Sequence, residues 1–183
     1  MSSLEVSTTP RMGKLVLRNL IIALVITAAI LAAFGPAGWS AIGRAISNAH
    51  PHAPRLDLLA GAPAPIKIHL ATVTAALALA TFQMIGAKGR TTHRVIGWVL
   101  AVLLLVTAVT SLFIHDPRGG WFNPFQVFSV WTLFAVPVAL LAARSHNVRR
   151  HAYMMSGLYF GGMIFAGLLT LLPGRLLWRV FFG

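Results

Sequence analysis

Histidine is the residue type in this sequence that offers the widest choice of chemistry. The chain has seven histidines and no cysteine, and its three acidic residues, Glu5, Asp57 and Asp116, all lie outside the apolar runs. Thiolate nucleophiles and cysteine-held metal centres are therefore excluded, and no buried carboxylate pair exists for acid–base catalysis. Imidazole remains as the side chain that could bind a metal ion or a metal-containing cofactor.

Two of the histidines, His93 and His115, frame an apolar run that has no charged residue between Arg94 and Asp116. At about 1.5 Å per residue this run spans roughly 33 Å, the thickness of the hydrocarbon core of a bilayer, so we predict a transmembrane helix. Along a helix with about 100° per residue, the second histidine returns to within roughly 40° of the first. Both rings should therefore project from one face, one at each membrane surface.

The composition extends this interpretation to the whole chain. Of its 183 residues, 57% are hydrophobic and 10% are charged, which excludes a soluble globular protein. We predict one all-α membrane domain over residues 1–183, a five-transmembrane-helix bundle. The expected helices cover about residues 20–34, 66–85, 95–114, 125–142 and 152–172. Residues 35–64 should form an external loop, and the tail 174–183 should form a short interfacial helix with Arg175 and Arg179 on one side.

The basic residues predict the orientation. Of the 15 Lys and Arg residues, nine lie in the N-terminal tail, the turn after the second helix and the loop after the fourth, and six lie on the other side. Because positive charge favours the cytoplasmic side, we expect a cytoplasmic N terminus and a C terminus on the opposite side of a bacterial inner (plasma) membrane. The net charge of +12 then points to anionic lipid headgroups as partners. No stacking platform accompanies the basic loops, so nucleic acid is not an expected partner.

In this topology the histidines form one candidate pair per membrane surface. His93 and His151 start the third and fifth helices at the cytoplasmic surface, and His69 and His115 lie near the outer surface. A haem b held by two imidazoles needs one histidine from each of two packed helices at the same depth. We therefore expect His93 with His151, and His69 with His115, as haem iron ligands. The interpretation that competes for each of the four is that a histidine at a helix end only anchors the helix at the interface.

Glycines accompany the inner pair. Gly97 and Gly157 are expected to make room for a porphyrin beside His93 and His151. Gly157 and Gly161 also form a small-xxx-small spacing, which lets a neighbouring helix approach closely. We expect the remaining histidines, which lie in predicted loops, to have no ligand role. A metal site built from His50 and His52 with a helix histidine would lack a carboxylate ligand.

Several segments resemble a known family of small bacterial membrane proteins. They are THRVIGW at 92–98, RRHAYMMSGLYFGG at 149–162 and, most specifically, LLPGRLLWRVFFG at 171–183. Over about residues 65–183 they resemble a predicted integral membrane protein family of unknown function, which implies a topology and a compartment but no reaction. Many of those relatives have Ser-Pro-Ile-His where this chain has Asn-Pro-Phe-Gln at 123–126, so the resemblance leaves the inner pair intact and removes a histidine from the outer side.

The arrangement of the histidines also resembles cytochrome b561-type proteins, which hold two haems between helices, one near each surface. That likeness implies transmembrane electron transfer, as a membrane oxidoreductase or an electron carrier, with a quinone or a redox protein as partner. The alternative is a cofactor-free accessory or assembly subunit that docks on a larger membrane complex through Gly157 and Gly161. Replacement of His93 or His151 by alanine separates the two, since only the first requires a bound haem.

Overall fold

The computed structural model describes residues 9–32, 35–114 and 126–183, and within these every regular element is a helix. Four described helical segments are long and apolar enough to cross a membrane: α4 (Ala64–Ile85), α5 (Thr91–Leu112), α6 (Gln126–Arg144) and the segment Val148–Leu169. The last segment comprises α7 (Val148–Gly157), the π-helix η1 (Leu158–Phe165) and α8 (Ala166–Leu169). The chain is therefore a multi-pass membrane protein whose four described spans lie close to the predicted ranges.

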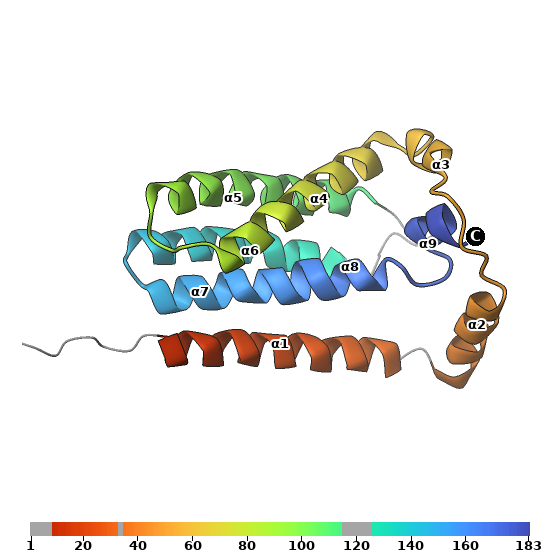
Figure 1. Ribbon diagram of the computed structural model, residues 1–183, viewed down its shortest axis with the longest axis horizontal. Coiled ribbons are helices and arrows are strands. Elements are labelled where there is room, and N and C mark those ends of the chain that lie inside the picture. Colours follow the sequence, from red (N-terminus) through yellow and green to blue (C-terminus); the bar gives the residue numbers. More distant parts are fainter. Residues whose placement is uncertain (1–8, 33–34, 115–125) are drawn as a thin grey trace, which may run out of the picture.

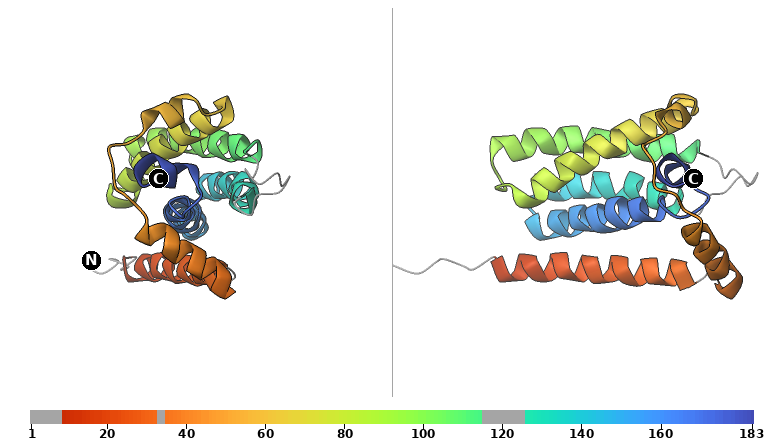
Figure 2. Two further views of the ribbon diagram at one scale, coloured as in Figure 1. Left: turned by 90° about the vertical axis from the view of Figure 1, so that its right-hand side faces the viewer. Right: turned by 45° about the vertical axis from the view of Figure 1, so that its right-hand side comes forward.

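The four spans pack side by side with alternating direction (Figures 1 and 2). Each packs against the next along the chain, and η1 contacts α4, so that the ring closes and α5 lies diagonally opposite α7. The centre is filled by small and aliphatic side chains, among them Ala76, Leu100, Ala135, Val136 and Leu158. Alanines at such contacts let helix backbones approach closely. The resulting van der Waals contacts stabilise the bundle, since the hydrophobic effect does not drive helices together within a bilayer.

Helix α1 (Thr9–Ala32) lies along the outside of this bundle, against α7 and η1 (Figure 2). Its contact is polar at one point: the Nδ2 group of Asn19 donates to the backbone oxygen of Tyr153 at 2.7 Å and to Oγ of Ser156 at 2.6 Å. α1 covers most of the first predicted span, 20–34, and begins well before it. That it crosses the membrane, and that the N terminus is cytoplasmic, stay predictions.

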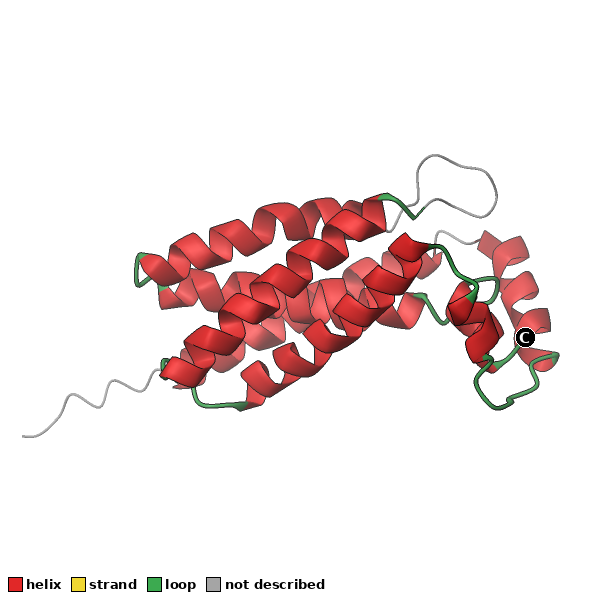
Figure 3. Ribbon diagram, turned by 90° about the horizontal axis from the view of Figure 1, so that it is seen from above, coloured by secondary structure: helices red, strands yellow, loops and turns green. Residues whose placement is uncertain are grey.

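The predicted loop 35–64 contains two short helices, α2 (Gly35–Ser47) and α3 (Leu56–Ala60). The connection between them lies against α9 (Leu176–Phe181), because the backbone nitrogens of His50, His52 and Arg55 donate to the oxygens of Phe182, Phe181 and Val180. Figure 3 shows α2, α3 and α9 gathered at one end of the bundle. We call this end the α9 end, and the opposite end, where α5 and α7 begin, the His93 end.

The last span differs from the regular helix expected over 152–172. It starts at Val148 and changes to π-helical hydrogen bonding after Gly157. A π segment inserts an extra residue per turn and turns the following side chains to a new direction, a feature found often at functional sites. Hydropathy is the same for α- and π-helical residues, so the sequence pattern could not reveal it.

Candidate functional site: the histidines of the bundle

The rings of His93 and His151 meet across the bundle at the His93 end. Each histidine lies in the first turn of its helix, α5 or α7, and each is half-buried. Their ring centroids are 6.4 Å apart and their planes are inclined by 81°. Two imidazoles that bind one metal ion from opposite sides, with nitrogen–metal bonds of about 2 Å and a ring radius of about 1.1 Å, have centroids about 6.3 Å apart. The observed separation is compatible with such an ion, and it also lies within the range of an ordinary edge-to-face ring contact.

Hydrogen bonds fix the proton of His93 on Nδ1. The Nε2 group of Gln83 donates to the backbone oxygen of His93 at 2.8 Å, which sets the orientation of the amide, so its Oε1 faces Nδ1 of the same histidine at 2.8 Å. An amide oxygen can only accept, so Nδ1 must donate. In the neutral ring Nε2 is then unprotonated and carries a lone pair.

His151 is held in the same way by a backbone group. Its Nδ1 lies 2.9 Å from the backbone oxygen of Ala139 on α6, which is also an acceptor without a proton. Neither Nε2 atom has a hydrogen-bond partner in the part of the chain that the structure describes. A ring that donates Nδ1–H to an oxygen and keeps a free Nε2 is the arrangement found in most metal-ligating histidines.

Positive charge surrounds this pair of rings. The guanidinium of Arg144 lies over the ring of Trp98, 5.7 Å from its centroid, and that of Arg18 lies 4.6 Å from the centroid of Tyr153. Further exposed basic side chains at this end are Lys88, Arg90, Arg94, Arg149 and Arg150. Such a surface suits lipid phosphates or the carboxylates of a cofactor.

The two glycines beside the pair lie next to polar side chains of neighbouring helices. A Cβ atom on Gly97 would lie 3.5 Å from Nε2 of Gln83, and one on Gly157 would lie 3.8 Å from Nδ2 of Asn19. Both glycines therefore lie beside a polar side chain of a neighbouring helix, and that they make room for a porphyrin stays a prediction. Gly157 lies against α1, while nothing lies within 4 Å of a Cβ placed on Gly161, so a packing role for the Gly157–Gly161 spacing stays a prediction too.

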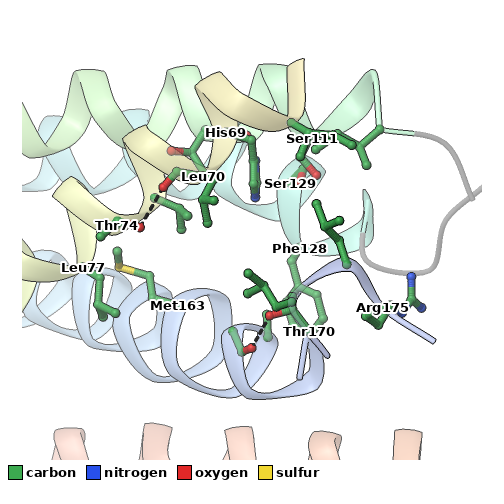
Figure 4. A pocket seen from close by; sticks show the side chains of 18 of the residues that line it. His69, Leu70, Thr74, Leu77, Ser111, Phe128, Ser129, Met163, Thr170 and Arg175 are labelled. Carbon is green, nitrogen blue, oxygen red and sulfur yellow. Dashed lines mark hydrogen bonds between the residues drawn. The ribbon is translucent and has the colours of Figure 1, made fainter. Parts of the chain in front are cut away.

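His69 and His115, the expected outer pair, cannot be compared, because His115 lies outside the described residues. The ring of His69 extends from α4 into a cavity of about 770 Å³ at the α9 end (Figure 4). Its Nδ1 donates to the backbone oxygen of Thr107 on α5 at 3.0 Å, so its Nε2 is also unprotonated in the neutral ring. Sequence reasoning did not find this cavity, because its lining comes from α3 to α9.

The other histidines do not join these sites. His50 and His146 are exposed, and His52 lies with Nδ1 2.8 Å from the oxygen of Ala53 and Nε2 3.2 Å from that of Gly183. Within residues 9–32, 35–114 and 126–183, no three histidine or acidic side chains gather in a group that could hold a metal ion.

Comparison with known proteins places most of this chain in one family. Residues 66–181, which extend from the third residue of α4 to the last residue of α9, match the family model of a predicted membrane protein, DUF2306. No curated protein and no solved structure matches the chain. The match includes His69, His93 and His151 and begins after α1, α2 and α3. The chain belongs to the DUF2306 family of predicted membrane proteins, whose function is unknown.

Proposed function

We propose that this chain is a b-type haem protein of the bacterial inner membrane that transfers electrons, with His93 and His151 as the axial ligands of one haem. The observation that carries the proposal is the meeting of the two rings, with centroids 6.4 Å apart and both Nδ1 atoms bonded to oxygens. Two Nε2 lone pairs on opposite helices form the donor set of a bis-histidine haem. When bound, the haem would supply a carrier of one electron.

The surrounding residues have definite roles in this proposal. Gln83 and the carbonyl of Ala139 hold the two rings in the ligating tautomer. The basic side chains at the His93 end, including Arg94 and Arg149, offer charge partners for two propionates. Hydrogen bonds from Nδ1 to neutral oxygens make the imidazoles only slightly more basic, which favours a higher reduction potential than carboxylate partners would give.

The alternative, a cofactor-free accessory subunit of a larger complex, has weaker support. It needs the face that carries Gly157 and Gly161 to receive a partner helix. Gly157 lies against Asn19 of α1, so the chain's own first helix already occupies part of that face. We therefore rank this alternative second.

A reduced-minus-oxidised visible spectrum tests the proposal. The full chain, expressed with haem supplied and purified in detergent, should show a sharp b-type band near one haem per chain. His93→Gly and His151→Gly should each lose this band, and imidazole added to the medium should restore it, because the free base fills the vacated ligand position. The matched control is His50→Ala, which replaces an exposed histidine and should keep the band.

Size-exclusion chromatography and circular dichroism of each variant show whether it has folded. A folded, monodisperse wild-type protein without a haem band would overturn the proposal and favour the accessory subunit. A band that survives both glycine variants would assign the haem to other ligands and overturn the proposal equally.

A further inference from the structure

The cavity at the α9 end is large, mostly apolar, lined by several elements and partly open to the outside of the bundle. It extends along α4 from Ile66 to Leu77, about 16 Å at 1.5 Å per residue. Leu104 on α5 and Leu158 on η1 line its deeper part, and Leu177 on α9 lines it near the end of the bundle. A volume of about 770 Å³ is typical of sites for small organic ligands. The cavity can therefore hold an elongated molecule with a long apolar part.

Polar side chains line this cavity from several elements, and Arg175 and Arg179 contribute two positive charges on its α9 side. His69 offers Nε2 as an acceptor, because Nδ1–H is donated to Thr107. The hydroxyls of Ser111 on α5 and Ser129 on α6 line the same space, and neither has a hydrogen-bond partner among the described residues (Figure 4). Ser129 as a residue is only 7% exposed. No described side-chain polar atom is both fully buried and without a partner, so these two hydroxyls open onto the cavity, where a bound ligand can hydrogen-bond with them.

These polar side chains gather near the end of the cavity that lies toward the membrane surface. His69 lies near the start of α4, Ser111 is the last residue but one of α5, and Ser129 lies in the first turn of α6. The hydroxyls of Thr74 and Thr170, which also line the cavity, donate instead to backbone oxygens of their own segments at 2.7 and 2.6 Å. The unsatisfied polar atoms are thus concentrated at one end, and the deeper lining is apolar.

We infer that this cavity binds a membrane-soluble quinol, whose ring hydroxyl donates to Nε2 of His69 and whose ring oxygens bond with Ser111 and Ser129, with the apolar tail along Leu77 and Leu104. The chemistry of the acceptor selects this class. A neutral histidine that presents a lone pair requires a donor, which a phenolic hydroxyl supplies and a lipid phosphate does not. The oxidised quinone has only acceptor oxygens, so it has no proton to donate to the Nε2 lone pair of His69.

This inference does not rest on haem at His93 and His151, because binding can be measured without it. The two sites lie at opposite ends of the bundle: along α5, His93 and Thr107 are about 21 Å apart. A variant that removes the inner ligand therefore leaves the cavity unchanged, and failure of one proposal is distinguishable from failure of the other.

Isothermal titration of the full chain in nanodiscs, without oxygen and with empty nanodiscs as the blank, tests the inference. The probes are decylubiquinol and decylubiquinone. The titration is done in the wild type and in His151→Ala, so that heat from haem reduction does not contribute. We expect one quinol per chain in both proteins. The quinol should bind about tenfold or more tightly than the quinone, because the quinone leaves Nε2 of His69 without a donor.

Variants assign the contacts. His69→Leu should weaken quinol binding about tenfold or more and remove the preference over quinone, and the milder Ser129→Ala should weaken it several-fold. The matched control is Thr74→Val, which lines the same cavity but has its hydroxyl already bonded to Leu70. It should bind as the wild type does.

Four results would overturn the inference: no saturable binding, equal affinity for quinol and quinone, unchanged affinity in folded His69→Leu, or a haem band that disappears in His69→Ala. The last would assign the cavity to a haem. Unchanged affinity in His69→Leu would assign it to lipid chains that need no donor or acceptor.

Discussion

Replacement of Gln83 by leucine should weaken haem binding about 30-fold if the histidine pair at the His93 end is a ligand pair. Gln83 makes two hydrogen bonds to one residue: its Nε2 donates to the backbone oxygen of His93, and its Oε1 accepts from Nδ1 of the same residue, both at 2.8 Å. The second bond fixes the tautomer that leaves Nε2 able to bind a metal. Partners of metal-bound histidines typically account for about 10- to 100-fold in affinity, and about 30-fold is the middle of this range.

The assay is titration of haem into the apoprotein, followed at the Soret band. Nitrogen NMR of the apoprotein checks the tautomer directly, since His93 should carry its proton on Nδ1 in the wild type and lose this preference in Gln83→Leu. Gln83→Glu is the informative companion variant. Its carboxylate still accepts from Nδ1 and makes the ring more basic, so the midpoint potential should fall while the haem remains bound.

One result would refute the reasoning. If Gln83→Leu binds haem within twofold of the wild type, keeps its midpoint potential and keeps the proton of His93 on Nδ1, then the amide does not position the ring. A folded protein that loses all haem in this variant would instead show that the amide contributes more than two ordinary hydrogen bonds.

Three further predictions concern α1, the orientation and the one described ion pair. Asn19→Leu should weaken the docking of α1 by about 1 kcal/mol, since two interhelical hydrogen bonds of about 0.6 kcal/mol each are lost, and unfolding in SDS should begin at lower detergent. Because the chain has no cysteine, Ser47→Cys and His146→Cys each provide a single labelling site, one at each end of the bundle. A membrane-impermeant maleimide added to intact cells should label Ser47→Cys and not His146→Cys. The reverse result would invert the predicted orientation. The guanidinium of Arg55 lies 3.1 Å from the carboxylate of Asp57 and lowers the pKa of that carboxyl group, so any stability from the pair is present at neutral pH and is lost as the pH falls through the lowered pKa. In Arg55→Ala, NMR titration should show the pKa of Asp57 raised toward its ordinary value. Tm should stay unchanged, because both groups are exposed.

Apolar length predicted the spans well, because the bilayer thickness imposes it. The predicted range 66–85 corresponds to α4, and 95–114 corresponds to α5 with a shift toward the N terminus. The shift has a physical cause: Thr91 to Arg94 are polar, yet they continue the helix beyond the hydrocarbon, where hydropathy gives no signal. α3 and the backbone pairing of α9 with residues 50–55 were not predicted, since both depend on contacts between segments far apart in the sequence.

The pairing of the two inner histidines was predictable, and the side chains and backbone groups that orient their rings were not. Depth alone paired His93 with His151, and the structure brings their rings together. Gln83 forms an interhelical hydrogen bond with His93 because a tight turn joins α4 and α5 and because Gly97 has no side chain in the way. The sequence pattern carries no signal for either the rotamer of Gln83 or the extent of the cavity beside His69.

The hydrogen bonds of the helix histidines bear on the choice between a ligand role and interface anchoring. A histidine that only anchors a helix end is expected to turn its ring to water and headgroups. His69, His93 and His151 each donate Nδ1–H to an oxygen instead, on the neighbouring helix of the bundle, and each is partly buried. One such bond could arise from packing, but three rings at both ends share the same nitrogen and the same kind of acceptor. Because this leaves three Nε2 lone pairs directed away from the nearest acceptors, the shared tautomer favours binding of an electrophile or a donor at these nitrogens: a metal between His93 and His151, and a hydroxyl at His69.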